Sequence, residues 1–410
     1  MQRITSEPLW EFNNHKMAPV LFNSPEKCCA CRACSNACPN GAITFQEDRF
    51  GFWFPTIDES LCINCGRCRS VCIFQNDEVD FRQTPIKGYA ATLSDKTLIK
   101  NSTSGGVFMA MAEWVLSKGG YVFGCVWDEN MNAKHVCAES MEQVLPMQGS
   151  KYVQSNVGNI YVEVKRKLQD GRHVLFSGTP CQVAALKSYL GGKEYENLIT
   201  LDLICHGVPN NKFFHQFLSV LEKKYKGKVT DFHFRHKKPD WQHSCVWMEI
   251  KRGKKRLYRE LSYIESLYST LYSGKNQCSR QSCSQCKYAC NKRVGDMTIG
   301  DFWGYKKLDI SFDYKDGLSC ILVNHSKVLP IISQLKLITQ EVPIEAIIDG
   351  NNHLRRPSIM DEKWGYVMET FAQSGFDMLV KEYEKKNVRI IKAKIRRMLP
   401  QQLLSILFKS

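Results

Sequence analysis

The sequence predicts an α/β main domain with a mostly parallel sheet, preceded by a small α+β domain that is rich in cysteine. Three observations predict this arrangement. Cysteines crowd the first 82 residues, apolar runs alternate with helical patterns from about residue 86 to residue 352, and the remaining tail is basic with helical spacing. Apolar strands that alternate with helices are typical of parallel sheets. We therefore expect domains at 1–82, 83–352 and 353–410.

Composition bounds the class of protein. The chain has 410 residues, of which 43% are hydrophobic and 24% charged, as in folded proteins with one or two sizeable cores. No run approaches the roughly 18 apolar residues of a membrane span, and the first twenty residues lack the apolar stretch of a signal peptide. We therefore expect a cytoplasmic protein. In a reducing compartment, its 19 cysteines favour metal or redox chemistry over disulfides.

The cysteine-rich domain contains an internal repeat. "CCACRACSNACP" has the spacing CxxCxxCxxxC, and "CINCGRCRSVC" repeats it. Three thiolates of one tight loop can each reach a different iron of a 4Fe-4S cluster, while the fourth ligates the other cluster. We expect one cluster at Cys28, Cys31, Cys34 and Cys72, and a second at Cys62, Cys65, Cys68 and Cys38. Structural zinc suits this spacing poorly.

Residues 21 to about 76 thus resemble a bacterial-type ferredoxin domain with two 4Fe-4S clusters, which makes the small domain ferredoxin-like. The sequence departs from that pattern at Ile73, which stands where proline is usual. Cys29 lies outside the ligand spacing, and we expect it to pack beside the loop as a small apolar side chain.

The main domain reads as strand, turn and helix units. A helix is expected at 107–116 and a strand at 121–127. A strand at 173–177 precedes a helix at 181–190, and a strand at 198–204 precedes a helix at 212–225. Because the carboxyl ends of parallel strands meet at one edge of a sheet, we expect Cys181 and Cys205, which follow two of these strands, to converge.

A third metal centre is expected near these two cysteines. "CSRQSCSQCKYAC" offers Cys278, Cys283, Cys286 and Cys290. Either Cys283 and Cys286 join Cys181 and Cys205 in a third 4Fe-4S cluster, or the four local cysteines hold it alone. We prefer the first set because it explains the cysteines at the strand ends. A local zinc knuckle remains an alternative, as does a nucleophilic thiolate at Cys181.

The segment "NSTSGG" is the candidate cradle for a flavin phosphate, because Gly105 and Gly106 precede a helix whose N-terminus favours anions. A flavin converts between one-electron clusters and hydride chemistry. The alternative is a plain helix cap. His206 and Asp301 are candidate proton donors beside the flavin, although local hydrogen bonding is the commoner role of such residues.

A second resemblance covers residues 86 to about 352. "STSGGV", "GSKYVQS", "SGTPCQVAALK", "ICHGVP" and "IGDFWG" occur in this order and resemble the family formed by the beta subunits of the coenzyme F420 hydrogenases and dehydrogenases. The resemblance implies an iron-sulfur oxidoreductase that contains FAD. It places Ser102, Ser104, Gly105, Gly106 and Lys151 near the flavin and makes Cys181, Cys205, Cys283 and Cys286 cluster ligands. It leaves Cys278 and Cys290 unassigned.

The expected function is electron transfer between a ferredoxin, or another low-potential carrier, and an unknown small acceptor. Two other classes of protein remain open. A non-catalytic electron-transfer subunit would carry clusters without flavin. A zinc-bearing nucleic-acid binder would explain the cysteines and the charge, yet it leaves the SGG and GTPCQ turns unexplained, so we expect no nucleic-acid partner.

Basic charge is concentrated in two places. The chain has 56 Lys and Arg against 41 Asp and Glu, and its last thirty residues hold nine of the former against two Glu. A second basic stretch spans 235–256. Such charge suits acidic partners or anionic lipid, although a solvated face is as common. The tail could lie on a membrane surface or dock on a partner protein, which would associate the protein peripherally with a membrane.

Overall fold

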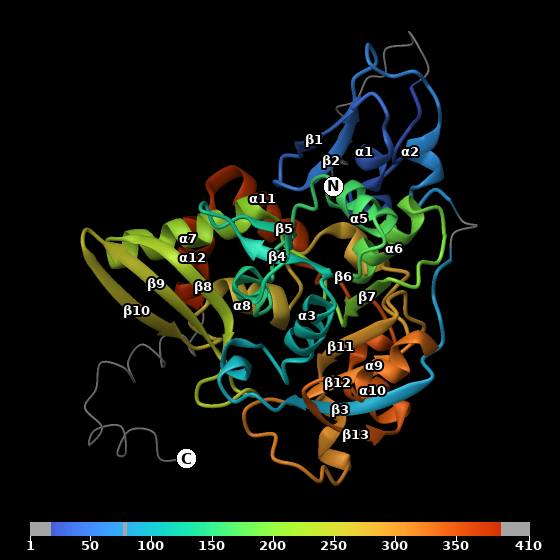
Figure 1. The fold of residues 1–410 in the computed structure, drawn as a ribbon. Helices are drawn as coiled ribbons and strands as arrows, with labels where there is room; N and C mark the ends of the chain where they lie inside the picture. Colours follow the sequence, from blue (N-terminus) through green and yellow to red (C-terminus); the bar gives the residue numbers. More distant parts are fainter. Residues whose placement is uncertain (1–17, 77–79, 387–410) are drawn as a thin grey trace, which may run out of the picture.

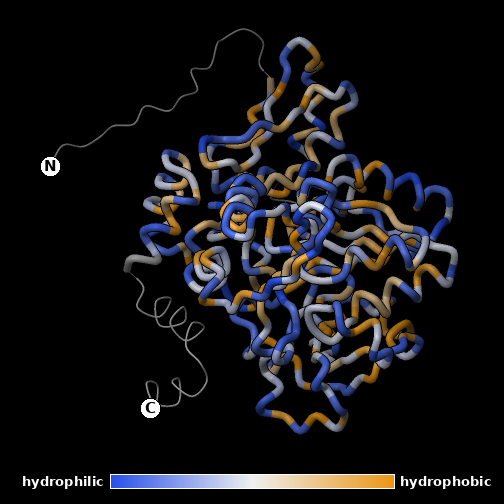
Figure 2. The backbone as a smooth tube through the Cα atoms, turned by 90° about the vertical axis from the view of Figure 1, so that its left-hand side faces the viewer, coloured by the Kyte–Doolittle hydropathy of each residue, from blue (hydrophilic) through white to orange (hydrophobic). Residues whose placement is uncertain are grey.

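The computed structural model describes residues 18–76 and 80–386, which form a small module and a larger domain. Figures 1 and 2 show the module, residues 18–76, projecting from one end of the molecule. It contains a hairpin and two short helices, namely β1 (Ile43–Glu47), β2 (Trp53–Ile57), α1 (Ala33–Ala37) and α2 (Arg67–Ser70). Among the described residues, the buried members of its own small apolar cluster are Leu21, Ile43 and Cys68. Domains with so little apolar packing usually need bonds of another kind, such as those to a metal.

The larger domain is built on one eight-stranded sheet, in the order β13-β3-β12-β11-β7-β6-β4-β5. Its strands are β3 (Lys87–Leu93), β4 (Tyr121–Trp127), β5 (Ala133–Ala138), β6 (Val174–Gly178), β7 (Leu198–Leu203), β11 (Met297–Asp301), β12 (Ser319–Val323) and β13 (Leu337–Val342). The four middle strands, β11, β7, β6 and β4, are parallel to one another. The carboxyl ends of these strands therefore share one edge.

The expectation of a mostly parallel sheet is wrong. Three neighbouring pairs are parallel, and the other four are antiparallel. At one edge, β5 follows β4 after residues 128–132, a connection too short for a parallel pairing. At the other edge, β3 comes from the start of the domain and pairs with β12 and β13 from its end. No local pattern in the sequence can predict the pairing of strands that lie so far apart in the chain.

Helices cover both faces of the sheet. They are α3 (Val107–Ser117), α4 (Met141–Val144), α5 (Ile160–Gln169), α6 (Pro180–Tyr189), α9 (Leu329–Ile332) and α10 (Ile344–Gly350). On one face, α3 and α9 share an apolar cluster with Leu175 and Ile321 of the sheet. On the opposite face, α5 and α6 pack against Phe176, and α10 packs against Leu322. The domain is therefore a three-layer α/β structure.

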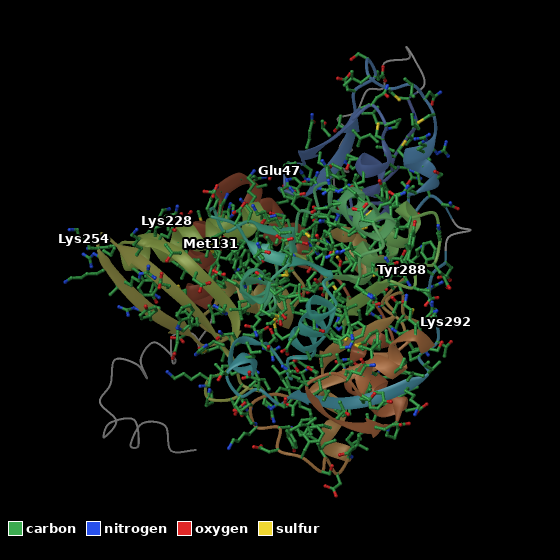
Figure 3. All side chains as sticks on the ribbon, viewed as in Figure 1. Glu47, Met131, Lys228, Lys254, Tyr288 and Lys292 are labelled. Atoms are coloured by element: carbon green, nitrogen blue, oxygen red, sulfur yellow. The ribbon has the colours of Figure 1, made fainter. Side chains whose placement is uncertain are left out.

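A second, antiparallel sheet extends from the larger domain on the left of Figure 1. It consists of β8 (Lys228–His236), β9 (Cys245–Arg252) and β10 (Lys255–Leu261), packed with α7 (Asn211–Tyr225), α11 (Trp364–Ser374) and α12 (Phe376–Lys386). Figure 3 shows Lys254 at its far tip. The alternation of Val246, Met248 and Ile250 was the signal that could have predicted this sheet.

The elements expected at 107–116, 121–127, 173–177, 181–190, 198–204 and 212–225 are present as α3, β4, β6, α6, β7 and α7. The short 3-10 helix η5 (Gln281–Gln285) lies in the cysteine segment that follows the second sheet. The described part of the tail is helical, and the basic segment 387–410 lies outside the described residues. No described helix is long and apolar enough to cross a membrane.

A buried carboxylate joins the middle strands to the helices around them. Asp296, which is 2% exposed, accepts hydrogen bonds from the backbone N–H and the hydroxyl of Thr200. The ammonium groups of Lys187 and Lys327 lie 3.6 and 3.1 Å from its carboxylate oxygens. Burial raises the pKa of Asp296, but the lysines and Thr200 outweigh it, so that the pKa lies below its ordinary value. The ionised form therefore stabilises the fold.

We expect Asp296→Asn to lower the free energy of unfolding by about 2 kcal/mol at pH 7, because it weakens charge-assisted hydrogen bonds. Since the folded pKa is depressed, this contribution is complete above the unfolded pKa of about 4 and is lost as the pH falls through the folded pKa. Urea titrations of both proteins at several pH values measure the difference. A difference that stays constant from pH 7 to about pH 3 would contradict this assignment.

Candidate functional site

A cavity of about 1070 Å³ opens at the carboxyl edge of the parallel strands. Its walls are formed by the loops after β6 and β7, by the end of β11 and by the loop before α3. Open α/β sheets place their ligands at this edge. Pockets for drug-sized ligands are about 300–1,000 Å³, so this cavity has room for a larger ligand such as a dinucleotide.

Seven cysteines line this cavity, and we call four of them, Cys181, Cys205, Cys283 and Cys286, the cavity set. Cys181 lies in the first turn of α6 and Cys205 follows β7, while Cys283 and Cys286 come from η5 and its C-cap. Burial raises the pKa of Cys283, and the thiols of Cys205, Cys286 and Cys181 raise it further. Burial together with Cys181 likewise raises the pKa of Cys205 to about 12. Each thiolate disfavours ionisation of the thiols close to it. A cationic metal centre would remove this repulsion, because it stabilises its ligands as thiolates.

The other two cysteines of the segment lie elsewhere. Cys278 is buried in the apolar cluster beneath the second sheet, and burial raises its pKa. Cys290 donates to the carbonyls of Lys287 and Lys292, and its sulfur accepts from Arg82 at 4.0 Å. Neither Cys278 nor Cys290 lines the cavity. The structure thus brings together the set that includes the two strand ends, and not the four local cysteines.

Several cysteines of the module lie near other members of the two sets expected from the repeat. We call Cys28, Cys31, Cys34 and Cys72 the inner set, and Cys38, Cys62, Cys65 and Cys68 the outer set. Burial raises the pKa of Cys34, with further contributions from Cys31, Cys28 and Cys72. Burial also raises the pKa of Cys68, to which the thiols of Cys65 and Cys38 add. Cys65 is exposed, whereas the inner set faces the larger domain.

The spacing of these donors does not suit a single metal ion. A tetrahedral zinc site places its ligands about 2.0–2.3 Å from one centre. Among the described residues, no three His, Cys, Asp or Glu side chains converge in that manner. In a 4Fe-4S cluster each thiolate binds a different iron, so its four ligands lie farther apart. The CxxCxxC spacing of the thiols in the module therefore fits a cluster better than zinc.

Cys29 connects the module to the cavity. Its thiol lies beside those of Cys181 and Cys31, and both neighbours raise the pKa of Cys29. Cys29 also contributes most to lowering the pKa of Cys181 to about 7. Cys29 is thus partly buried, as expected of a packed side chain, but it also lies between a cysteine of the inner set and one of the cavity set. The spacing could not indicate this, because the contact crosses from the module to the larger domain.

Tyr288 marks the same junction. Burial raises its pKa, and the thiols of Cys29, Cys181, Cys31 and Cys286 raise it further. Figure 3 shows Tyr288 below the module, at the level where the larger domain begins. A thiol of the inner set and thiols of the cavity set therefore both lie near Tyr288.

The SGG loop lines the cavity and opens onto α3. The Ser104 hydroxyl donates to the Leu318 carbonyl at 2.6 Å, and the Gly105 N–H donates to the Ser319 hydroxyl at 2.8 Å. A Cβ on Gly105 would lie 2.2 Å from the Ala91 carbonyl oxygen, so glycine is required there by close packing. The amide of Gly105 is thus occupied within the protein. A phosphate at this place would use the amides of the first turn of α3 instead.

The remaining candidate cofactor residues lie beside this loop. Ser102 is buried, and its hydroxyl accepts a hydrogen bond from the Gln148 amide. The Lys151 ammonium donates to the carbonyls of Met147, Gln148 and Gly149, so it stabilises the turn that precedes it in the chain. Burial lowers the pKa of Lys151. Ser102 and Lys151 both line the cavity.

His206 and Asp301 also line the cavity. The ring of His206 stacks on that of His353 at 3.9 Å, and burial followed by the charge of Arg235 lowers the pKa of His206 to about 4. Asp301 accepts from the Arg235 guanidinium at 2.9 Å through Oδ2, while its buried Oδ1 has no partner among the described residues. His353 and Arg235 were not predicted as site residues, because each comes from a part of the sequence without a motif.

The fold and its cysteine sets define the class of protein. Cysteines with the spacing of 4Fe-4S ligands lie in a small module, and further cysteines line a large cavity at the edge of an α/β sheet. Proteins that carry clusters of this kind transfer single electrons. The chain is therefore an iron-sulfur electron-transfer protein.

Comparisons with known proteins specify the family. Residues 171–343 match the family described as the C terminus of the coenzyme F420 hydrogenase/dehydrogenase beta subunit, and residues 27–76 match the 4Fe-4S dicluster domain. The chain therefore carries the C-terminal domain of the coenzyme F420 hydrogenase/dehydrogenase beta subunits together with an N-terminal 4Fe-4S dicluster domain.

Two curated relatives agree with this assignment. The F subunit of the F(420)H(2) dehydrogenase from Methanosarcina mazei is 22% identical over 306 residues, which are 70% of this chain and 80% of the relative. A ferredoxin-like protein in the nif region of Rhizobium leguminosarum bv. trifolii is 36% identical over 56 residues, which are 12% of this chain and 80% of the relative.

One solved structure is also similar. A chain of the F420-reducing [NiFe] hydrogenase complex from Methanosarcina barkeri matches with 19% identity and a TM-score of 0.44, covering 75% of this chain and 96% of that chain.

Proposed function

We propose that this chain is an oxidoreductase in which electrons pass from a low-potential carrier through three 4Fe-4S clusters to FAD in the cavity, and from there to a small acceptor. The observation that carries the proposal is the placement of Cys29. It packs in one cluster with Cys31 of the inner set and Cys181 of the cavity set. The cavity set in turn lines the same cavity as the SGG loop.

The outer set is the proposed point of electron entry. Cys65 is exposed, and its neighbours Ile63 and Leu61 are 62% and 47% exposed. Exposed apolar side chains beside a redox centre favour transient docking of a carrier protein such as a ferredoxin. The inner set lies farther in, because the larger domain donates hydrogen bonds to the carbonyls of Cys28 and Cys29.

The cavity fits FAD by its size and by its walls. The N-terminus of α3 faces it and favours a phosphate, while Arg235 and Lys238 supply cations. FAD, when bound, exchanges single electrons with clusters and two electrons with an acceptor. On the protein side, Ser104 and Gly105 hold the loop in place, and Oδ1 of Asp301 is available to accept a hydrogen bond from a ligand.

The identity of the electron carrier, the identity of the electron acceptor and the cellular location of the protein stay predictions. The mouth of the cavity includes Lys238, Tyr263 and Trp303, which would meet an acceptor that enters from solvent. We place the protein in the cytoplasm, with the basic segment 387–410 as the part that could contact a membrane or a partner.

Anaerobic purification followed by iron, sulfide, zinc and flavin analysis tests the proposal. We expect about twelve iron atoms per chain, from three clusters of four, and one FAD. About eight iron atoms without flavin would contradict it and would favour a non-catalytic electron-transfer subunit. Zinc in place of iron would contradict both.

A further inference from the structure

Arg280 and Arg293 are both buried to 1% exposure, but different groups balance their charges. The Arg293 guanidinium is paired with the Asp202 carboxylate at 3.0 Å. Arg280 forms no ion pair with any residue that the structure describes. Burying a cation is costly unless an anion lies close to it. Arg280 therefore requires an explanation that Arg293 does not.

The Arg280 side chain joins the module to the larger domain. Its Nε donates to the Cys28 carbonyl at 2.7 Å, and its Nη2 donates to the Trp53 carbonyl at 2.8 Å, both in the module. Its Nη1 donates to the Gln154 side-chain oxygen at 3.3 Å in the larger domain. Gln154 in turn donates to the Cys29 carbonyl at 2.8 Å. Two side chains of the larger domain thus hold the backbone of the inner loop.

None of these partners is an anion. The rings of Phe54 and Phe52 face the guanidinium, with centroids 4.4 and 5.7 Å away, and stabilise a cation only partly. Burial raises the pKa of Asp48, and the charge of Arg280 offsets only part of this rise. The Asp48 carboxylate and the Arg280 guanidinium form no ion pair. The remaining neighbour is the thiol of Cys28. Burial raises the pKa of that thiol, and Arg280 opposes the rise.

A cluster at the inner set would supply the missing anion. A 4Fe-4S cluster with four thiolate ligands is negatively charged, and reduction adds one more negative charge. The surroundings of Arg280 are buried, where electrostatic interactions are much stronger than in water. A fixed positive charge beside the cluster therefore favours the reduced form, because net charge and hydrogen bonding set cluster potentials.

We propose that Arg280 is a positioning residue that fixes the inner loop on the larger domain and raises the reduction potential of the inner cluster. This inference rests on the clusters of the proposed function. Arg280 also lies three residues before Cys283, and its backbone N–H donates to the Val208 carbonyl. Arg280 thus contacts both the loop of the inner set and the segment that carries Cys283 of the cavity set. Its charge favours transfer of an electron to the inner cluster.

The test is a redox titration, followed by electron paramagnetic resonance, of the full-length protein purified anaerobically with its clusters. Arg280→Met removes the charge and keeps much of the apolar stem. We expect one ferredoxin-type cluster to become at least tenfold harder to reduce, which is a fall of about 59 mV for one electron. The other ferredoxin-type cluster should keep its potential, since its ligands lie at the exposed end of the module.

Two further variants separate charge from structure. Arg67→Met is the matched control, because Arg67 is exposed and precedes Cys68 of the outer set, so that solvent screens its charge. We expect Arg67→Met to change the equilibrium constant for reduction of either ferredoxin-type cluster by less than twofold. Arg280→Lys keeps the charge but cannot make all three hydrogen bonds, so it should retain a potential close to that of the wild type. If Arg280→Met does not fold, the lysine variant still tests the role of the charge.

The outcomes distinguish this inference from the proposed function. Wild-type protein with fewer than about eight iron atoms would show that the clusters themselves are wrongly assigned. Iron-replete Arg280→Met with unchanged potentials would overturn the role of Arg280 and leave the clusters intact. An Arg280→Lys variant with full iron but a potential as low as that of Arg280→Met would likewise overturn it, because charge would then not be the cause.

Discussion

Replacing Cys205 with serine is expected to lower the iron content by about four atoms per chain, from about twelve to about eight, because one of three four-iron clusters loses a ligand. Cys205 lies at the end of a parallel strand, beside Cys181, Cys283 and Cys286. A hydroxyl is a much poorer ligand for iron than a thiolate. The measurement is iron and sulfide analysis of anaerobically purified protein.

Cys290→Ser is the matched control for this prediction. Cys290 belongs to the same sequence segment as Cys283, but its thiol donates to two backbone carbonyls and does not line the cavity. We expect its iron content to equal that of the wild type. Loss of iron from Cys290→Ser with none from Cys205→Ser would show instead that the four local cysteines hold the cluster.

The second large effect concerns the buried pair that supports the cavity set. Arg293→Met is expected to lower the free energy of unfolding by about 3–5 kcal/mol, because it leaves the carboxylate of Asp202 unpaired at 0% exposure. The guanidinium also donates to the carbonyls of Tyr288 and Cys290, which close the loop after Cys286. Urea unfolding followed by far-ultraviolet circular dichroism measures the loss.

Two controls separate the buried pair from charge in general. Lys87→Met breaks an exposed ion pair with Glu341 and should leave stability almost unchanged. The double variant Asp202→Asn with Arg293→Met removes both charges, so it should recover part of the loss. If the double variant were as unstable as the sum of both single losses, the unpaired carboxylate would not be the cause.

Local pattern was sufficient for the elements that face the cavity. The apolar run at β6, the GTP turn and the helix α6 follow one another within about twenty residues, so short-range preferences specify them. The same holds for the CxxCxxC loops, where spacing alone determines which thiols can reach one cluster. The antiparallel pairing of β3 with β12 and β13 was missed, because its partners lie more than two hundred residues apart.

Candidate residues without a motif were also missed. Arg280 lies near the start of the cysteine segment 278–290, and nothing in its immediate neighbours distinguishes a buried arginine from an exposed one. Its burial depends on Trp53 and Cys28 of the module, far away in the sequence. His353 likewise reaches the cavity only because the chain returns there after the second sheet.

The sequence by itself determined the donor chemistry of this protein: the repeat, its two sets of four thiols, and two cysteines that had to meet at one edge of a sheet. These follow from spacing, which acts over a few residues. Only the tertiary structure decided that Cys29 lies between the inner set and the cavity set, that Cys278 and Cys290 lie apart, and that Arg280 is buried without a counter-ion among the described residues. Each of these depends on packing between the module and the larger domain or between distant segments of the chain, and spacing within one segment cannot encode it.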